Sequence, residues 1–184
     1  MHYAYDEDHE TYRAEVARFA ERVLAPHYQS DDRAAQFRRQ QALDMAAMGL
    51  TGLRIPEAHG GQEATALIAG IAAEEIGRHD FNASYLLINT ALISDVLVRN
   101  ATPEQQAAWL PGIASGETIP CLCITEPGHG TDAAAMALKA IPADGGVWRL
   151  HGEKTSITLG MAADRAVVLA RTGGLGARGI SAFW

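Results

Sequence analysis

The chain has 184 residues, 48% of them apolar, and a formal net charge of −7 at pH 7. A chain of this size can build one sizeable core or two small ones. The acidic balance and the lack of any basic run argue against nucleic acid as the main partner, because phosphate recognition needs clustered lysines and arginines.

The spacing of residues disfavours three further classes: disulfide-rich, metal-binding and membrane-spanning proteins. Cys121 and Cys123 are two residues apart, which is neither a disulfide framework nor a metal motif, and the histidines show no metal-ligating spacing. The longest apolar run, 83–98, is interrupted by polar residues and is shorter than the about 20 residues that cross a bilayer, so we expect no membrane span. Few cysteines and no cleavable apolar leader predict a cytoplasmic protein.

The chain begins with a helical pattern. Apolar residues at helical spacing predict a helix over 6–24, ended by Pro26. A second helix is predicted over 33–48, with Asp31 or Asp32 as its N-cap.

Two further helices are predicted after a loop. Gly49 suggests a Schellman ending to the second helix. Helical periodicity then covers 63–78, where Glu74 and Arg78 form a favourable i,i+4 pair, and 82–99. The 82–99 segment is apolar on most sides, which places it at the centre of a bundle.

The clearest helix start is Thr102-Pro-Glu-Gln105, a capping box with proline at the first helical position. We expect Pro111 to interrupt this helix and Gly116 to end the helical half. The resulting prediction is an N-terminal α-helical domain over residues 1–117.

From Thr118 the pattern changes to short strands and turns, which predicts a β-domain over 118–184. The fold class is therefore α+β: a helical bundle followed by an antiparallel β-barrel or sandwich. The expected strands cover 118–125, 135–141, 146–151, 154–160, 164–171 and 178–184.

A glycine-rich turn follows the first of these strands. Gly128-x-Gly130-x-x-Ala133 matches the dinucleotide fingerprint literally, but the following helix could last only about ten residues and no βαβ unit surrounds it. A plain strand–turn–strand in which the glycines serve only the turn is the other interpretation. Such a turn also lets backbone amides approach an anionic or planar ligand.

The stretch Cys123-Ile-Thr-Glu-Pro-Gly-His-Gly-Thr-Asp132 resembles the first signature of the acyl-CoA dehydrogenase family. That signature runs small residue, aliphatic, Ser/Thr, Glu, two residues, small residue, Gly, Ser/Thr, Asp. Further similar stretches follow the family's order over the whole chain: 49–61, 102–117, 151–158 and 179–183.

The resemblance implies FAD bound along the β-domain, with an apolar wall and a few fixed donors. The cofactor-binding residues that it implies are Leu122, Ile124, Thr125, Gly130, Thr131, Ser156, Ile157 and Thr158. Thr125 would donate toward the flavin ring, Gly130 and Thr131 would approach the pyrophosphate, and Thr131 would also touch acyl-CoA. Candidate cations for the CoA phosphates are Lys139, Arg149, Lys154 and Arg171.

Two positions depart from the family pattern. Ser156 stands where many members have a tryptophan packed on the flavin, so flavin packing or acceptor access can differ, or a neighbour compensates. His129 stands where a small residue is usual, and is either a ligand contact or a solvated turn residue.

The activity implied is α,β-dehydrogenation of an acyl-CoA thioester with hydride transfer to FAD, in fatty acid or acyl-CoA metabolism. The catalytic carboxylate is expected in a C-terminal domain beyond Trp184, so these residues alone should be inactive. The expected partners are acyl-CoA, an electron-transfer flavoprotein as acceptor, and further copies in a homo-oligomer, either a dimer or a tetramer.

Two alternatives stay open. A flavin monooxygenase, an oxidase or a carrier-protein-thioester dehydrogenase would keep the same fold. A non-catalytic short subunit that pairs with a complete homologue would need no base of its own.

Overall fold

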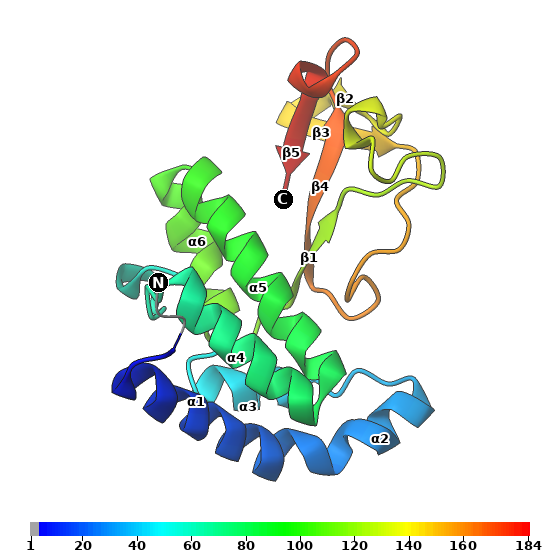
Figure 1. The fold of residues 1–184 in the computed structure, drawn as a ribbon. Coiled ribbons are helices and arrows are strands. Elements are labelled where there is room, and N and C mark those ends of the chain that lie inside the picture. The colour runs from blue at the N-terminus through cyan, green and yellow to red at the C-terminus, as the bar shows by residue number, and fades with distance from the viewer. Residues whose placement is uncertain (1–3) are drawn as a thin grey trace. The chain divides into compact units, whose positions relative to one another are not determined.

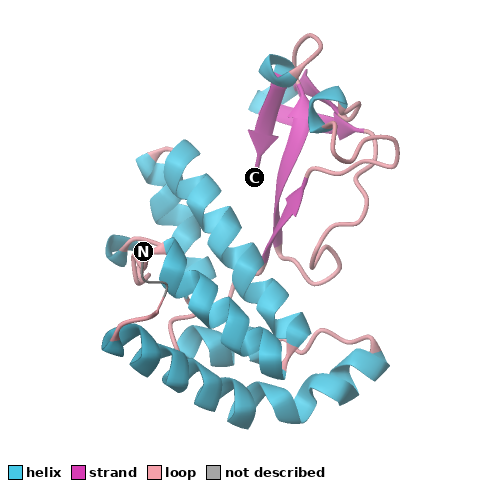
Figure 2. Ribbon diagram, in the orientation of Figure 1, coloured by secondary structure: helices cyan, strands magenta, loops and turns pink. Residues whose placement is uncertain are grey.

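The computed structural model describes residues 4–184 and divides into two compact units, at Ile119 and Pro120. The first unit is helical and the second is built on a sheet, as the cyan and magenta ribbons of Figure 2 show. The prediction of a helical domain followed by a β-domain is confirmed.

The first helix runs past its predicted end. Helix α1 covers Glu7–Phe19, a wide π-helical turn covers Ala20–Leu24, and α2 continues over Ala25–Ala34 (Figure 1). The prediction that Pro26 ends the helix is wrong. Pro26 occupies the first turn of α2, where its missing N–H costs least, because the π-helical turn divides the helix just before it.

The second predicted helix is shorter than expected. Helix α3 covers only Gln40–Ala47, because Ala35 takes a left-handed conformation (φ 50°) that ends α2. The predicted N-cap at Asp31 or Asp32 is wrong, because both residues lie inside α2 and Arg39 precedes α3; Asp31 instead accepts a hydrogen bond from Arg38 Nε at 3.0 Å.

The predicted Schellman ending of α3 is present. The Leu50 N–H donates to the Met45 carbonyl (3.0 Å) and the Gly49 N–H to the Ala46 carbonyl (2.8 Å). Gly49 has φ 73°, the left-handed geometry that glycine adopts at least cost.

Helices α4 (Ala66–His79) and α5 (Phe81–Asn100) form a packed pair in the helical unit. Asp80 separates them and caps α5, since its carboxylate accepts from the Ala83 N–H at 2.8 Å. The predicted Glu74–Arg78 pair forms at 3.0 Å.

Helix α5 has two faces rather than apolar burial all round. Its inner face is buried and includes Leu86, Ile93 and Leu97, whereas its outer face leaves large apolar side chains 43–54% exposed: Phe81, Tyr85, Ile88 and Leu92. By length and hydropathy alone α5 could cross a membrane. Half of its most apolar window is buried inside the structure, and core helices pass the same test, so this is weak support for a span.

Helix α6 covers Pro103–Ala114 and confirms the capping box. The Thr102 hydroxyl accepts from the Gln105 N–H at 3.3 Å, and the Gln105 side chain accepts from the Thr102 N–H at 2.9 Å. The expected interruption at Pro111 is wrong. The helix ends three residues later, so the backbone bond that proline cannot make is lost only in the last turn.

The sheet is open and mixed. Strand β1 (Pro120–Cys123) pairs in parallel with β4 (Arg165–Arg171), and β5 (Ile180–Phe183) pairs antiparallel with β4. Strands β2 (Lys139–Ala143) and β3 (Val147–His151) form a hairpin, which joins β4 through the parallel pair Lys139 and Arg171. The antiparallel barrel or sandwich that we predicted is therefore not what forms.

Two predicted strands differ from the structure. In place of a strand over 135–141, Ala133–Ala135 form a 3₁₀ turn and β2 starts at Lys139. Residues 154–160 form a loop, with Ser156 (φ 53°) and Leu159 (φ 59°) in the left-handed region. Two left-handed residues are incompatible with a continuous strand.

Gly70 offers a test of the helical unit. It lies inside α4, is exposed, and a Cβ there would meet no atom within 4 Å. Gly70→Ala should therefore raise the free energy of unfolding by about 0.5–1 kcal/mol, because alanine loses less backbone entropy in a helix. Urea unfolding measures this change. The contrasting variant is Gly61→Ala, whose Cβ would lie 2.0 Å from the Ile55 carbonyl oxygen and should destabilise. A stability loss in Gly70→Ala would contradict the expectation.

Candidate functional site

The candidate site begins at strand β1. Cys121 and Cys123 lie on one face, with their sulfur atoms 3.8 Å apart, and Cys121 is buried. Burial, with the neighbouring thiol of Cys123, raises the pKa of Cys121 to about 12, so this thiol stays protonated at neutral pH. These cysteines behave as small apolar packing residues, and the alternating Leu122 belongs to the opposite face.

A tight turn follows β1. Glu126 and His129 exchange two backbone hydrogen bonds of 3.0 and 3.1 Å around Pro127 and Gly128. Neither Gly128 nor Gly130 has a left-handed φ, and a Cβ on either would meet nothing within 4 Å. The described chain therefore does not itself require glycine at these positions, which suits a backbone that a ligand approaches closely.

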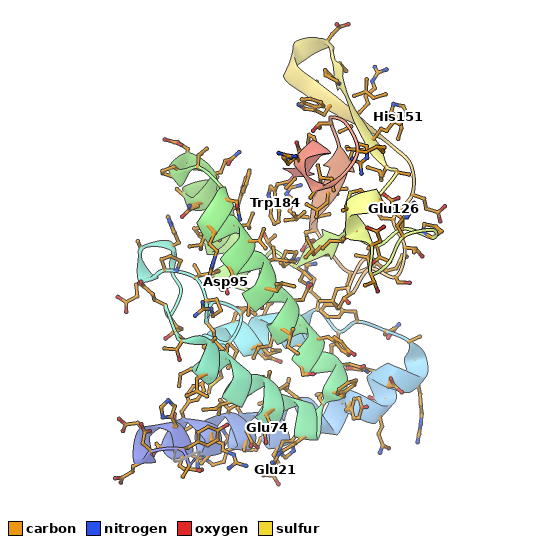
Figure 3. The ribbon with its side chains drawn as sticks, turned by 45° about the horizontal axis from the view of Figure 1, so that its top comes forward. Glu21, Glu74, Asp95, Glu126, His151 and Trp184 are labelled. Carbon is orange, nitrogen blue, oxygen red and sulfur yellow. The ribbon has the colours of Figure 1, made fainter. Side chains whose placement is uncertain are left out.

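A buried ion pair lies behind this turn. The Lys154 ammonium is 2.9 Å from Glu126 Oε1, and the two side chains are 7% and 5% exposed. The Glu126 carboxylate also accepts from the backbone N–H groups of Ala137 (2.6 Å) and Leu138 (2.9 Å). Figure 3 labels Glu126 on the segment after β1.

The electrostatics of Glu126 reflect two opposing effects. Burial raises the pKa of its carboxyl, but the Ala137 and Leu138 amides and the Lys154 ammonium outweigh burial, so the pKa lies below its ordinary value. Glu126 is therefore ionised at neutral pH and serves the structure of the turn rather than proton transfer.

The same lysine connects the two stretches of predicted site residues. Lys154 Nζ donates to the Ile124 carbonyl at 2.8 Å, and the Thr155 N–H donates to the Thr125 carbonyl at 3.0 Å. Within residues 4–184, no hydrogen bond engages the N–H or the hydroxyl of Thr125. Thr125 thus has an anchored carbonyl and two free donors.

The other predicted residues belong to the two stretches that meet at this junction and differ in exposure. Leu122, Ile124 and Ile157 are half-buried and apolar, as a wall for a planar ring requires. The exposed predicted residues are Gly130, Thr131, Ser156 and Thr158. Among the described residues, no hydrogen bond joins 130–131 to 156–158, so the junction of Thr125 with Thr155 is what brings the two stretches together.

Two of the four candidate phosphate cations serve the fold instead. Lys154 donates to the Ile124 carbonyl and to the Glu126 carboxylate. Arg171 donates to four backbone carbonyls, those of Ala134 (2.8 Å), Met136 (2.9 Å), Gly174 (2.6 Å) and Gly176 (3.2 Å). Lys139 remains exposed on β2 and Arg149 on β3. The glycine-rich run that begins two residues after Arg171 supplies two of these carbonyls, those of Gly174 and Gly176.

Among the residues that the structure describes, no group of three or more His, Cys, Asp or Glu side chains could hold a metal ion.

The comparisons with known proteins identify the class of both units. The model of the acyl-CoA dehydrogenase N-terminal domain matches residues 6–117, and that of the acyl-CoA dehydrogenase middle domain matches residues 121–184. Short-chain specific acyl-CoA dehydrogenase of Bos taurus is 35% identical over 96% of this chain and 43% of its own length.

Solved structures of acyl-CoA dehydrogenases support the same assignment. Butyryl-CoA dehydrogenase from Megasphaera elsdenii superposes with a TM-score of 0.89 at 27% identity, over 100% of this chain and 49% of that one. Glutaryl-CoA dehydrogenase from Mycobacterium smegmatis, in complex with FADH2, has a TM-score of 0.87 at 29% identity, over 97% and 45%. The chain belongs to the acyl-CoA dehydrogenase family, and it spans less than half the length of these relatives.

Proposed function

We propose that the protein is an FAD-dependent acyl-CoA dehydrogenase, which removes hydrogen from Cα and Cβ of an acyl-CoA thioester. The observation that carries the proposal is Thr125, whose carbonyl is anchored and whose N–H and hydroxyl are free. A flavin ring edge offers carbonyl and nitrogen acceptors that suit two such donors. The glutaryl-CoA dehydrogenase neighbour, which is in complex with FADH2, supports the cofactor.

The residues present fit FAD in chemical type. Leu122, Ile124 and Ile157 offer apolar contact, and Thr125 offers fixed donors. The remaining predicted contacts are Gly130, Thr131, Ser156 and Thr158, of which Gly130 and Thr131 would lie against the pyrophosphate and Thr131 also against acyl-CoA. When bound, FAD supplies the hydride acceptor.

The protein's own groups have narrower tasks. Thr125 binds and orients, and the half-buried apolar residues exclude water from the ring face. Glu126 is ionised, buried and fully engaged with Lys154 and two amides, so it does not take up the substrate proton. The α-proton would go to a carboxylate outside residues 1–184, as the resemblance implies.

The proposed partners follow from the family. Acyl-CoA would be the substrate, an electron-transfer flavoprotein the electron acceptor, and further copies of the chain would form a dimer or tetramer. The relatives named above, which carry short-chain acyl-CoA, butyryl-CoA and glutaryl-CoA in their names, support a CoA thioester.

Anaerobic mixing with a panel of acyl-CoA esters tests the proposal. The protein expressed from its complete gene should purify with bound FAD, and at least one ester should bleach the absorption band of oxidised flavin. Free CoA is the control and should cause no bleaching. A flavin-free protein, or flavin that no ester bleaches, would contradict the proposal.

A second candidate function is a flavin oxidase or monooxygenase of the same fold. Ser156 favours it, because this exposed serine replaces the usual tryptophan and leaves the predicted flavin face without a large aromatic cover. Rapid reoxidation of the reduced protein by oxygen, with a flavin hydroperoxide spectrum, would support this candidate over the dehydrogenase.

A further inference from the structure

Burying the Lys154 ammonium costs desolvation free energy. Its ammonium lies in a nearly dry environment, 7% exposed, against Glu126 Oε1, the Ile124 carbonyl and the Met136 sulfur at 3.7 Å. A buried ion pair commonly contributes no more stability than apolar residues of similar volume. Stability alone therefore gives little reason for a cation at this position.

The contact with Ile124 supplies a reason. The Ile124 carbonyl and the Thr125 N–H belong to the same planar, trans peptide unit, in which the two groups point in opposite directions. Fixing the carbonyl by Lys154 at 2.8 Å therefore fixes the direction of the Thr125 N–H. A cation on the carbonyl oxygen also polarises the amide and makes its N–H a stronger donor.

A second hydrogen bond fixes the peptide unit on the other side of Thr125. The Thr125 carbonyl belongs to the next peptide unit and accepts from the Thr155 N–H at 3.0 Å. Thr155 directly follows Lys154, so one short segment holds the peptide units on both sides of Thr125. Glu126 completes the arrangement, since its carboxylate holds the ammonium in place and is itself held by Ala137 and Leu138.

We propose that Lys154 is a positioning residue that aims and polarises the Thr125 N–H toward an acceptor on the bound ligand. This inference rests on the proposed function, in which the acceptor is the edge of the flavin ring. Reduced flavin carries more negative charge than oxidised flavin, so a stronger donor at its edge binds the reduced form preferentially. Lys154 should therefore raise the reduction potential of the bound FAD.

The double variant Lys154→Met with Glu126→Gln tests the role. It removes both charges together, so the net charge beside the ligand is unchanged, and it leaves neither a buried ammonium nor a buried carboxylate unpaired. The amide oxygen that Glu126→Gln introduces can still accept from a backbone N–H. What is lost is the bond from the ammonium to the Ile124 carbonyl, together with the acceptor of either the Ala137 or the Leu138 N–H, because the glutamine side chain has a single oxygen.

The measurement is the midpoint potential of FAD in the protein expressed from its complete gene. We expect reduced FAD to lose about tenfold in binding relative to oxidised FAD, which corresponds to a potential lower by about 30 mV for a two-electron couple. The matched control is Arg178→Met with Glu153→Gln, which also removes one charge of each sign, but from two exposed positions of the sheet unit, and should leave the potential unchanged.

The possible results distinguish the positioning role of Lys154 from the proposed function on which that role rests. An unchanged potential in the double variant, with FAD bound, would show that the ion pair is only structural and would overturn the role of Lys154 alone. The same shift in the Arg178→Met, Glu153→Gln control would also overturn it, because a general effect of removing charged side chains would then be the cause. Wild-type protein that binds no FAD would overturn the proposed function itself.

Discussion

Glu126→Ala is expected to lower the free energy of unfolding by about 3–5 kcal/mol, the range observed when one partner of a buried ion pair is removed. The substitution leaves the Lys154 ammonium buried without its counter-charge, and it removes the acceptor of the Ala137 and Leu138 amides. Each buried donor left without a partner adds to the loss. Denaturant unfolding measures the total.

Hydrogen exchange locates the effect. The amides of Ala137 and Leu138 should lose protection first, because Glu126 is their acceptor in the folded chain. Glu153→Ala is the matched control, since Glu153 is exposed, lies beside Lys154 in sequence and should change stability by no more than about 0.5 kcal/mol. A loss below about 1 kcal/mol for Glu126→Ala would show that water or rearrangement replaces the carboxylate.

The same carboxylate gives the sheet unit a defined acid sensitivity. The pKa of Glu126 is lower in the folded protein than the value of about 4.3 for an unfolded chain. Its stabilising effect is therefore fully present above about pH 4.3 and is lost as the pH falls through the folded pKa. Glu126→Gln should weaken this part of the acid dependence, which unfolding measured across the acid range would reveal.

Local signals in the sequence predicted local structure well. The capping box at Thr102 and the Schellman ending at Gly49 depend on residues within one helical turn, and both form as predicted. Pro26 and Pro111 were misleading, because proline removes one backbone bond without deciding whether the chain continues as helix. Beside Pro26, buried residues such as Phe19 and Leu24 hold the helix across the π-helical turn.

Long-range pairing could not be predicted in the same way. Glu126 lies in the predicted glycine-rich turn, but its partner Lys154 lies 28 residues away and was named as a candidate for phosphate binding. The strand expected over 154–160 fails for the same reason, since Lys154 and Thr155 use their donors on Ile124 and Thr125 rather than on a neighbouring strand. Parallel pairing of β1 with β4 likewise leaves no local sequence signal.

Gly130→Val is expected to weaken FAD binding by about 10- to 100-fold while leaving the stability of the unliganded protein within about 0.5 kcal/mol of wild type. The two effects separate because the described chain has no atom within 4 Å of a Cβ at Gly130 and no left-handed φ there. The Cβ of an added side chain therefore meets only what binds from outside. Titration with FAD, followed by the quenching of its fluorescence, measures the affinity.

Gly174→Val provides the matched control. Gly174 is also exposed in the sheet unit, a Cβ there would likewise meet nothing within 4 Å, and its φ lies outside the left-handed region, but no predicted FAD contact lies in its loop. FAD binding should be unchanged in this variant. Equal losses of affinity in both variants would mean that added bulk perturbs the unit in general. An unchanged affinity in Gly130→Val would remove the pyrophosphate from this turn, and the glycines would then serve only the backbone between β1 and the 3₁₀ turn at Ala133–Ala135.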